Sequence, residues 1–78
     1  MKYKGEIIAK NQYNDFYLVE QFLMFHVIES SDSLDIGDII YWDGEDNFFN
    51  ETQGIMISGI IQYENISYNQ GIQVLRTI

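Results

Sequence analysis

The chain has 78 residues, of which 46% are hydrophobic and none is cysteine, so disulfide bonds and thiolate metal sites are excluded. Its formal net charge is −8 at pH 7, from 12 acidic and 4 basic residues, which disfavours direct binding of nucleic acid. The length predicts a single domain, residues 1–78. No stretch approaches the roughly 20 apolar residues of a membrane span and no signal peptide follows Met1, so we expect a cytoplasmic protein with no membrane partner.

The first third of the chain predicts three strands. Apolar and charged side chains alternate over residues 2–10, the pattern of a half-buried strand. Residues 11–15 have the polar composition of a turn, and residues 16–20 predict a second strand. Residues 22–29 are nearly all apolar, which indicates a strand buried on both faces, with a buried helix as the alternative.

The middle of the chain predicts two further strands. A loop at residues 30–33 leads toward residues 39–42, whose β-branched and aromatic content is typical of a strand. Residues 43–51 form the longest polar stretch, and residues 54–63 predict the last strand. Gly59 in its middle indicates a bulge or a sharp bend, as the wall of a barrel requires.

The C-terminal segment favours a short helix at about residues 68–76. Ser67 and Gln70 have the spacing of a capping box, in which the two side chains satisfy free backbone donors at a helix start. Arg76 would then lie at the helix C-terminus, where a cation is favourable. The alternative is a strand over the same residues, which would place Arg76 on an apolar face.

Five short strands joined by polar turns predict a mainly β fold, a small and strongly bent five-stranded barrel. The order of the early strands, followed by Gly37-Asp38 just before Ile39-Ile40, resembles the front half of the OB-fold and related SH3-like barrels over residues 3–42. The resemblance implies a barrel that binds single-stranded nucleic acid through aromatic and basic side chains. The chain departs from that pattern, because residues 11–75 contain no lysine or arginine.

The acidic residues are concentrated in one segment. Residues 11–75 hold every acidic residue except Glu6, and eight of them fall within residues 29–51. Few cations are present to neutralise these carboxylates, so they must face water or the basic surface of a partner. We predict a partner-binding acidic face, with a solubilising surface of turn-forming residues as the alternative. The face would comprise Asp32, Asp35, Asp38, Asp43, Glu45, Asp46 and Glu51.

Other chemistries have weaker support. His26 is the only histidine and its neighbours are apolar, which favours a packed, hydrogen-bonded side chain over a catalytic one. Residues 43–47 are rich in oxygen ligands, but the EF-hand order requires Gly and Glu where Phe48 and Gly54 stand. We therefore predict no catalytic residue, no metal site and no cofactor.

The leading functional hypothesis is a non-catalytic acidic module that binds a basic protein surface. It includes an inhibitor that occupies the nucleic-acid groove of its partner, by analogy with small acidic phage and mobile-element proteins that block host defence enzymes. Phe48 and Phe49 interrupt a polar stretch, so at least one is predicted to be an exposed hydrophobic anchor.

Two other hypotheses remain. The chain would be an OB-like single-strand binder if its terminal cations and surface aromatics formed one patch. The cations are Lys2, Lys4, Lys10 and Arg76. A homo-oligomeric structural subunit is the third hypothesis.

Overall fold

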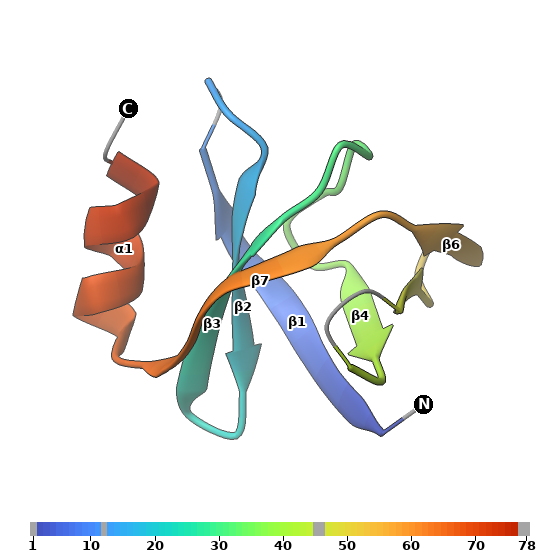
Figure 1. Ribbon diagram of the computed structural model, residues 1–78, viewed down its shortest axis with the longest axis horizontal. Coiled ribbons are helices and arrows are strands. Elements are labelled where there is room, and N and C mark those ends of the chain that lie inside the picture. Colours follow the sequence, from blue (N-terminus) through green and yellow to red (C-terminus); the bar gives the residue numbers. More distant parts are fainter. Residues whose placement is uncertain (1, 12, 45–46, 77–78) are drawn as a thin grey trace.

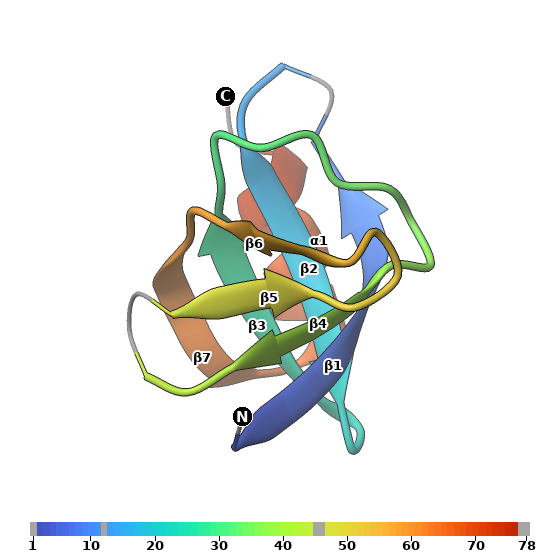
Figure 2. The same cartoon turned by 90° about the vertical axis from the view of Figure 1, so that its right-hand side faces the viewer.

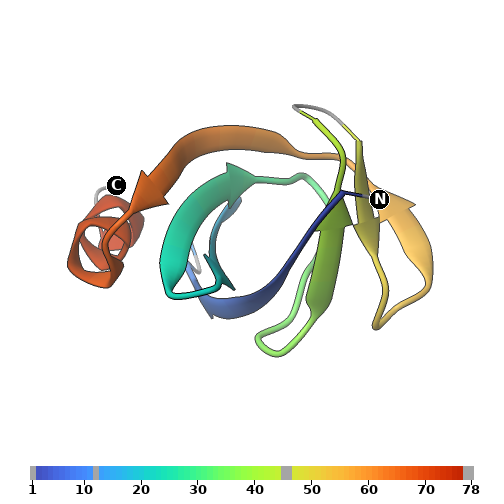
Figure 3. The ribbon, with the colours of Figure 1, turned by 90° about the horizontal axis from the view of Figure 1, so that it is seen from below.

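The computed structural model describes residues 2–11, 13–44 and 47–76, which form one curled antiparallel sheet and one helix (Figure 1). The strands are β1 (Tyr3–Lys10), β2 (Phe16–Gln21), β3 (Met24–Glu29), β4 (Ile39–Trp42), β5 (Phe48–Asn50), β6 (Ile55–Ile57) and β7 (Ile60–Ile66), and the helix is α1 (Tyr68–Arg76). The strand order is β6-β5-β4-β1-β2-β3-β7. Seen from below, the sheet curls into a half-barrel with α1 on its outer side (Figure 3).

The mainly β class is confirmed, but the predicted number of five strands is wrong. A short strand, β5, forms inside the polar stretch at residues 43–51, because Phe48 and Asn50 turn inward while Phe49 pairs with Tyr41. The late strand bends at residues 58–59 into β6 and β7, which pair with β5 and β3 at opposite edges of the sheet. The bend predicted at Gly59 is therefore present.

The boundary predicted for the third strand is also wrong. Phe22 and Leu23 form the two-residue turn that joins β2 to β3, and the pair Gln21 and Met24 closes it. Both turn residues have positive φ, 49° and 64°, and both side chains are exposed. Burial on both faces holds only for residues 26–28, which are all buried.

Two apolar cores explain why those three consecutive residues are buried. The first fills the inside of the curled sheet and contains Ile7, Tyr17, Val19, Ile28, Leu34, Ile40, Trp42, Phe48 and Ile57. The second lies between the outer face and α1, where Leu75 packs on Leu18 and Val27. Gly71 brings the helix backbone so close to Leu18 that a Cβ there would overlap the leucine side chain.

The C-terminal helix and its capping box are confirmed. The Gln70 backbone N–H donates to Ser67 Oγ at 3.1 Å, and the Ser67 N–H donates to Gln70 Oε1 at 2.9 Å. At the other end the Asn11 side-chain amide donates to the Leu75 carbonyl, which ties the β1–β2 loop to the helix. In the described part of the chain, no helix has both the length and the apolar character needed to cross a membrane.

Candidate functional site

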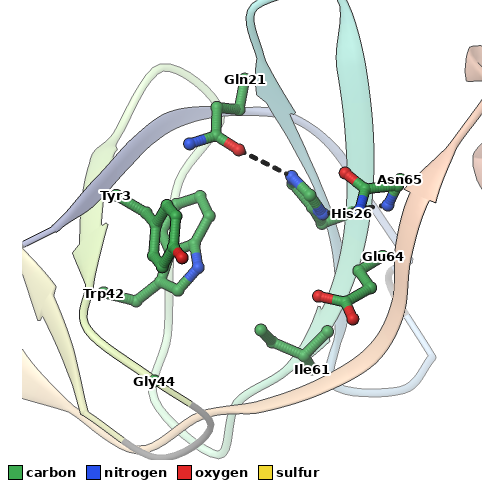
Figure 4. Close-up of a pocket in the computed structure, with 8 residues that line it drawn as sticks. All are labelled: Tyr3, Gln21, His26, Trp42, Gly44, Ile61, Glu64 and Asn65. Atoms are coloured by element: carbon green, nitrogen blue, oxygen red, sulfur yellow. Dashed lines mark hydrogen bonds between the residues drawn. The ribbon is translucent and has the colours of Figure 1, made fainter.

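A pocket of about 270 Å³ opens at one end of the half-barrel (Figure 4). Its lining comes from β1, β2, β3, β4 and β7 and from the segments that follow β4. The lining residues are Tyr3, Gln21, His26, Trp42, Gly44, Ile61, Glu64 and Asn65. Strands distant in the sequence meet here because the sheet curls and brings β7 across its open side.

The imidazole of His26 is held by hydrogen bonds within the protein. The Asn65 backbone N–H donates to His26 Nδ1 at 3.2 Å, so the ring proton lies on Nε2, which contacts Gln21 Oε1 at 3.0 Å. Burial lowers the pKa of His26 below 6.5, and the nearby charge of Glu64 opposes this by raising it. The predicted buried, hydrogen-bonded histidine is confirmed.

The rest of the pocket combines aromatic faces with a carboxylate. The rings of Tyr3 and Trp42 stack with centroids 5.8 Å apart, and Glu64 lies on the opposite side of the cavity (Figure 4). Trp42 is only 5% exposed because its ring stacks on both Tyr3 and Phe48, so Tyr3 supplies the accessible aromatic surface. An aromatic ring and a carboxylate both attract positive charge, so this lining suits a cationic group. Among the described residues, no three His, Asp or Glu side chains are grouped to hold a metal ion.

Within the predicted acidic face, Asp32 and Asp35 lie in the loop between β3 and β4. Asp32 is half-buried, and its Oδ2 accepts from the Ser58 backbone N–H at 2.7 Å. This bond ties the loop to the bend between β6 and β7. Asp35 is exposed and lies 3.8 Å from Lys10 Nζ. Both carboxylates therefore remain accessible at the surface to different extents.

Asp38 does not belong to the solvent-facing surface, contrary to the prediction. Its side chain is 5% exposed, and Oδ2 accepts from Asn50 Nδ2 at 2.7 Å and from Gln53 Nε2 at 2.9 Å. The Asp35 backbone N–H donates to the same oxygen at 3.0 Å. These three donors fix Asp38 as a buried link between the β3–β4 and β5–β6 loops.

Asp43 and Glu51 are both exposed but lie at opposite ends of β4. Asp43 follows the last residue of β4, whereas the Glu51 N–H donates to the carbonyl of Ile39 at its start. Figure 2 shows β4 and β5 side by side. Glu45 and Asp46 lie outside the described residues. The accessible acids of the predicted face thus occupy three loops around the β4–β5 hairpin, and we call Asp32, Asp35, Asp43 and Glu51 the acidic loops. Other exposed acids lie elsewhere on the molecule, namely Glu6, Asp15 and Glu64.

Of the two residues predicted as a hydrophobic anchor, Phe48 and Phe49, only one is accessible to a partner. Phe48 is completely buried in the inner core, where its ring stacks on Trp42 at 6.3 Å. It contacts no solvent because the alternation of β5 turns it inward. Phe49 points to the other face and is half-buried, so it alone retains exposed surface.

The four cations do not all converge into one patch. Lys2 and Lys4 lie over the rings of Tyr3 and Tyr41, 5.6 and 5.5 Å from the centroids. Lys10 lies at the other end of β1, where Nζ donates to the Leu34 carbonyl at 3.3 Å. Arg76 ends α1, where the Asn11 side chain donates to the Leu75 carbonyl, so it lies near the Lys10 end of β1.

Comparison with protein-family models, curated proteins and solved structures gives no match. The function is therefore argued from the chemistry of the surface and from the pocket.

Sequence reasoning missed the two large apolar residues that are most exposed in the described part of the chain. Phe22 is 92% exposed and Leu23 is 81% exposed, although the apolar run at residues 22–29 predicts a buried strand. One signal was available: the strands predicted at residues 16–20 and 22–29 leave only Gln21 between them, whereas the shortest common hairpin turn has two residues. The turn had to extend into one of these strands, but no glycine, asparagine or proline marked the position.

Proposed function

We propose that this protein is a non-catalytic module that binds a partner protein with a basic surface, its carboxylates lying where the phosphates of a nucleic acid would otherwise bind. The acidic loops supply part of this surface. A field of one sign attracts a cationic partner and raises the rate of association. The proposal includes inhibition, since occupation of a nucleic-acid groove would exclude the natural ligand.

The observation that carries the proposal is the scarcity of internal charge pairing. Within the described residues, the only ion pair is Lys10 with Asp35, at 3.8 Å between Nζ and Oδ1, and the two side chains are 40% and 77% exposed. The chain nevertheless has a net charge of −8. Its remaining surface carboxylates therefore keep their field available to an external cationic surface.

The pocket at the end of the half-barrel supports binding rather than catalysis. Both ring nitrogens of His26 are engaged with Gln21 and Asn65, so neither is directed at a substrate. The exposed Tyr3 ring and the exposed Glu64 carboxylate instead offer an aromatic surface and a negative charge, a combination that favours a cationic side chain such as lysine or arginine.

Binding of single-stranded nucleic acid is the competing function, and one observation favours it. Lys2 and Lys4 lie over tyrosine rings, and cations beside aromatic rings are a common arrangement at single-strand sites. The pair would have to act against the net charge of −8, and Lys10 lies at the far end of β1. Affinity for phosphates depends on the number of cations engaged, so we rank this function second.

The test begins with affinity capture from a lysate of the source cells on the immobilised chain. A specific partner should elute as salt rises, because screening shortens the reach of surface charges to about 8 Å at 0.15 M. The triple variant Asp35→Asn, Asp43→Asn, Glu51→Gln should retain much less of this partner. A matched triple, Asp35→Glu, Asp43→Glu, Glu51→Asp, keeps the charge and should retain it.

A direct binding measurement distinguishes nucleic-acid binding from protein binding. Fluorescence anisotropy of a labelled oligothymidylate should show no binding to the chain across a salt series. Salt-dependent binding that is lost in Lys2→Gln, Lys4→Gln would overturn the proposal in favour of nucleic acid. Equal capture of the partner by both triple variants would also contradict it.

A further inference from the structure

The tip of the β2–β3 hairpin exposes two large apolar side chains side by side. Phe22 and Leu23, at 92% and 81%, are the most exposed large hydrophobic residues of the described chain. The next residue, Met24, is 42% exposed. The hairpin projects from one end of the sheet (Figure 1), so the tip is accessible to a cavity on another molecule.

The backbone at the tip is unfavourable for the residues it carries. Phe22 and Leu23 have φ of 49° and 64°, and two successive positive values are the signature of a type I′ turn. Asparagine and glycine normally occupy both positions, while a bulky residue there is a steric outlier. Neither side chain contributes to a core, so the fold gains nothing that offsets the strain. Such outliers persist where the residue has a function.

The surface beside the tip carries two facing carboxylates and one lysine. Glu6 and Glu20 lie directly opposite each other on β1 and β2, and like charges in that position are destabilising. Neither has an ion pair within the described residues. Together with Lys4, whose Nζ lies over the Tyr41 ring, they line a shallow hollow of about 530 Å³ that continues to Phe22 and Leu23, so the hollow has one more negative than positive charge.

We propose that Phe22 and Leu23 are the hydrophobic anchor by which this protein docks into an apolar pocket of its partner, whose rim carries lysine or arginine opposite Glu6 and Glu20. A large apolar side chain that fills a dehydrated pocket contributes much of the affinity of an interface. Cations on the rim would neutralise the two facing carboxylates. The inference rests on the proposed function, since it assigns the contact residues for the same basic partner.

A bilayer is the less favoured occupant of the tip. Insertion of Phe22 and Leu23 would bring Glu6 and Glu20 close to the headgroups, where anionic lipids repel carboxylates and dehydration is costly. A protein pocket avoids this cost because it can supply a cation at each position.

The test uses Phe22→Asn, Leu23→Gly, which places the preferred type I′ pair at the tip. Because the strain is removed and no core contact is lost, the melting temperature should rise by about 4–8 °C. Affinity for the purified partner, measured by calorimetry, should fall by about 30-fold or more. The matched control is Tyr13→Asn, which removes a 72% exposed aromatic side chain from the loop at the opposite end of β2; it should leave affinity unchanged.

Each remaining outcome overturns the inference. Suppose that the Phe22→Asn, Leu23→Gly variant (the tip variant) binds the partner as tightly as the native chain, while the charge-neutral triple variant does not bind. The assignment of the anchor to the tip is then wrong, and the proposed function stands. If no partner that binds specifically can be isolated, both fail. A fall in melting temperature would show that the tip serves folding. Cosedimentation of the native chain, but not the tip variant, with phosphatidylcholine or phosphatidylglycerol vesicles would assign the tip to a membrane.

Discussion

Gly59 lies directly against the ring of Phe48, and a side chain at residue 59 would overlap that ring. The contact positions the bend between β6 and β7 over the inner core. It also explains why a three-residue strand in a polar stretch is stable, since Phe48 is enclosed from several sides. The curvature that forms the pocket therefore depends on one glycine and one phenylalanine.

Gly59→Ala should destabilise the protein by about 1–3 kcal/mol, because a methyl group forced into a filled core displaces its neighbours. The measurement is the midpoint of urea unfolding. Gly44→Ala is the matched control, since a Cβ there meets no atom within 4 Å, and its midpoint should not fall. Equal midpoints for both variants would mean that the ring of Phe48 moves aside freely.

Asp38→Ala should lower the free energy of unfolding by about 2–3 kcal/mol, because it leaves the buried amide of Asn50 without an acceptor. The exposed Asp43→Ala should change stability by no more than about 0.5 kcal/mol. Urea unfolding of the two variants distinguishes a structural carboxylate from a surface one. Similar losses in both would contradict the assignment of Asp38 to the loop link.

Ser67→Ala should destabilise the protein by about 1 kcal/mol, because it removes the hydroxyl that accepts from the Gln70 N–H at the start of α1. Ser33→Ala, at an exposed loop residue, serves as the control and should be neutral. Hydrogen exchange at the first turn of α1 should accelerate only in the first variant.

The stability of the protein should fall as the pH drops below about 6.5, because the pKa of His26 is lowered in the folded state. The unfolded chain then binds a proton that the folded chain does not, so stability is complete above the unfolded pKa and declines through the interval below it. Glu64→Gln removes the charge that raises this pKa and should steepen the decline. Unfolding midpoints between pH 7.5 and about 5.5, compared with those of His26→Gln, measure the effect. A decline of equal slope in that variant would assign it to other groups.

Local signals in the sequence predicted the parts of the fold that local chemistry determines. The capping pair Ser67 and Gln70 located the helix, the alternation of residues 2–10 located β1, and Gly59 located the bend. These features depend on backbone preferences of a few adjacent residues. Each can therefore be predicted without knowledge of the tertiary contacts.

The remaining features depend on contacts between distant segments. Phe48 is buried because β6 and β7 fold over it, and Asp38 is buried because Asn50 and Gln53 approach it from another loop. The turn at Phe22 and Leu23 has apolar side chains where turn chemistry requires asparagine or glycine, so local propensity pointed to a strand. The residues of greatest functional interest are those at which the local preference and the fold disagree.

The most direct test of the proposed function is competition for the captured partner. A labelled oligonucleotide bound to that partner would be titrated with the native chain while its anisotropy is recorded. We predict that anisotropy falls to the value of the free oligonucleotide, and that the charge-neutral triple variant requires a much higher concentration to displace it. Unchanged anisotropy at saturating chain, or a rise that signals a ternary complex, would contradict binding in a nucleic-acid groove.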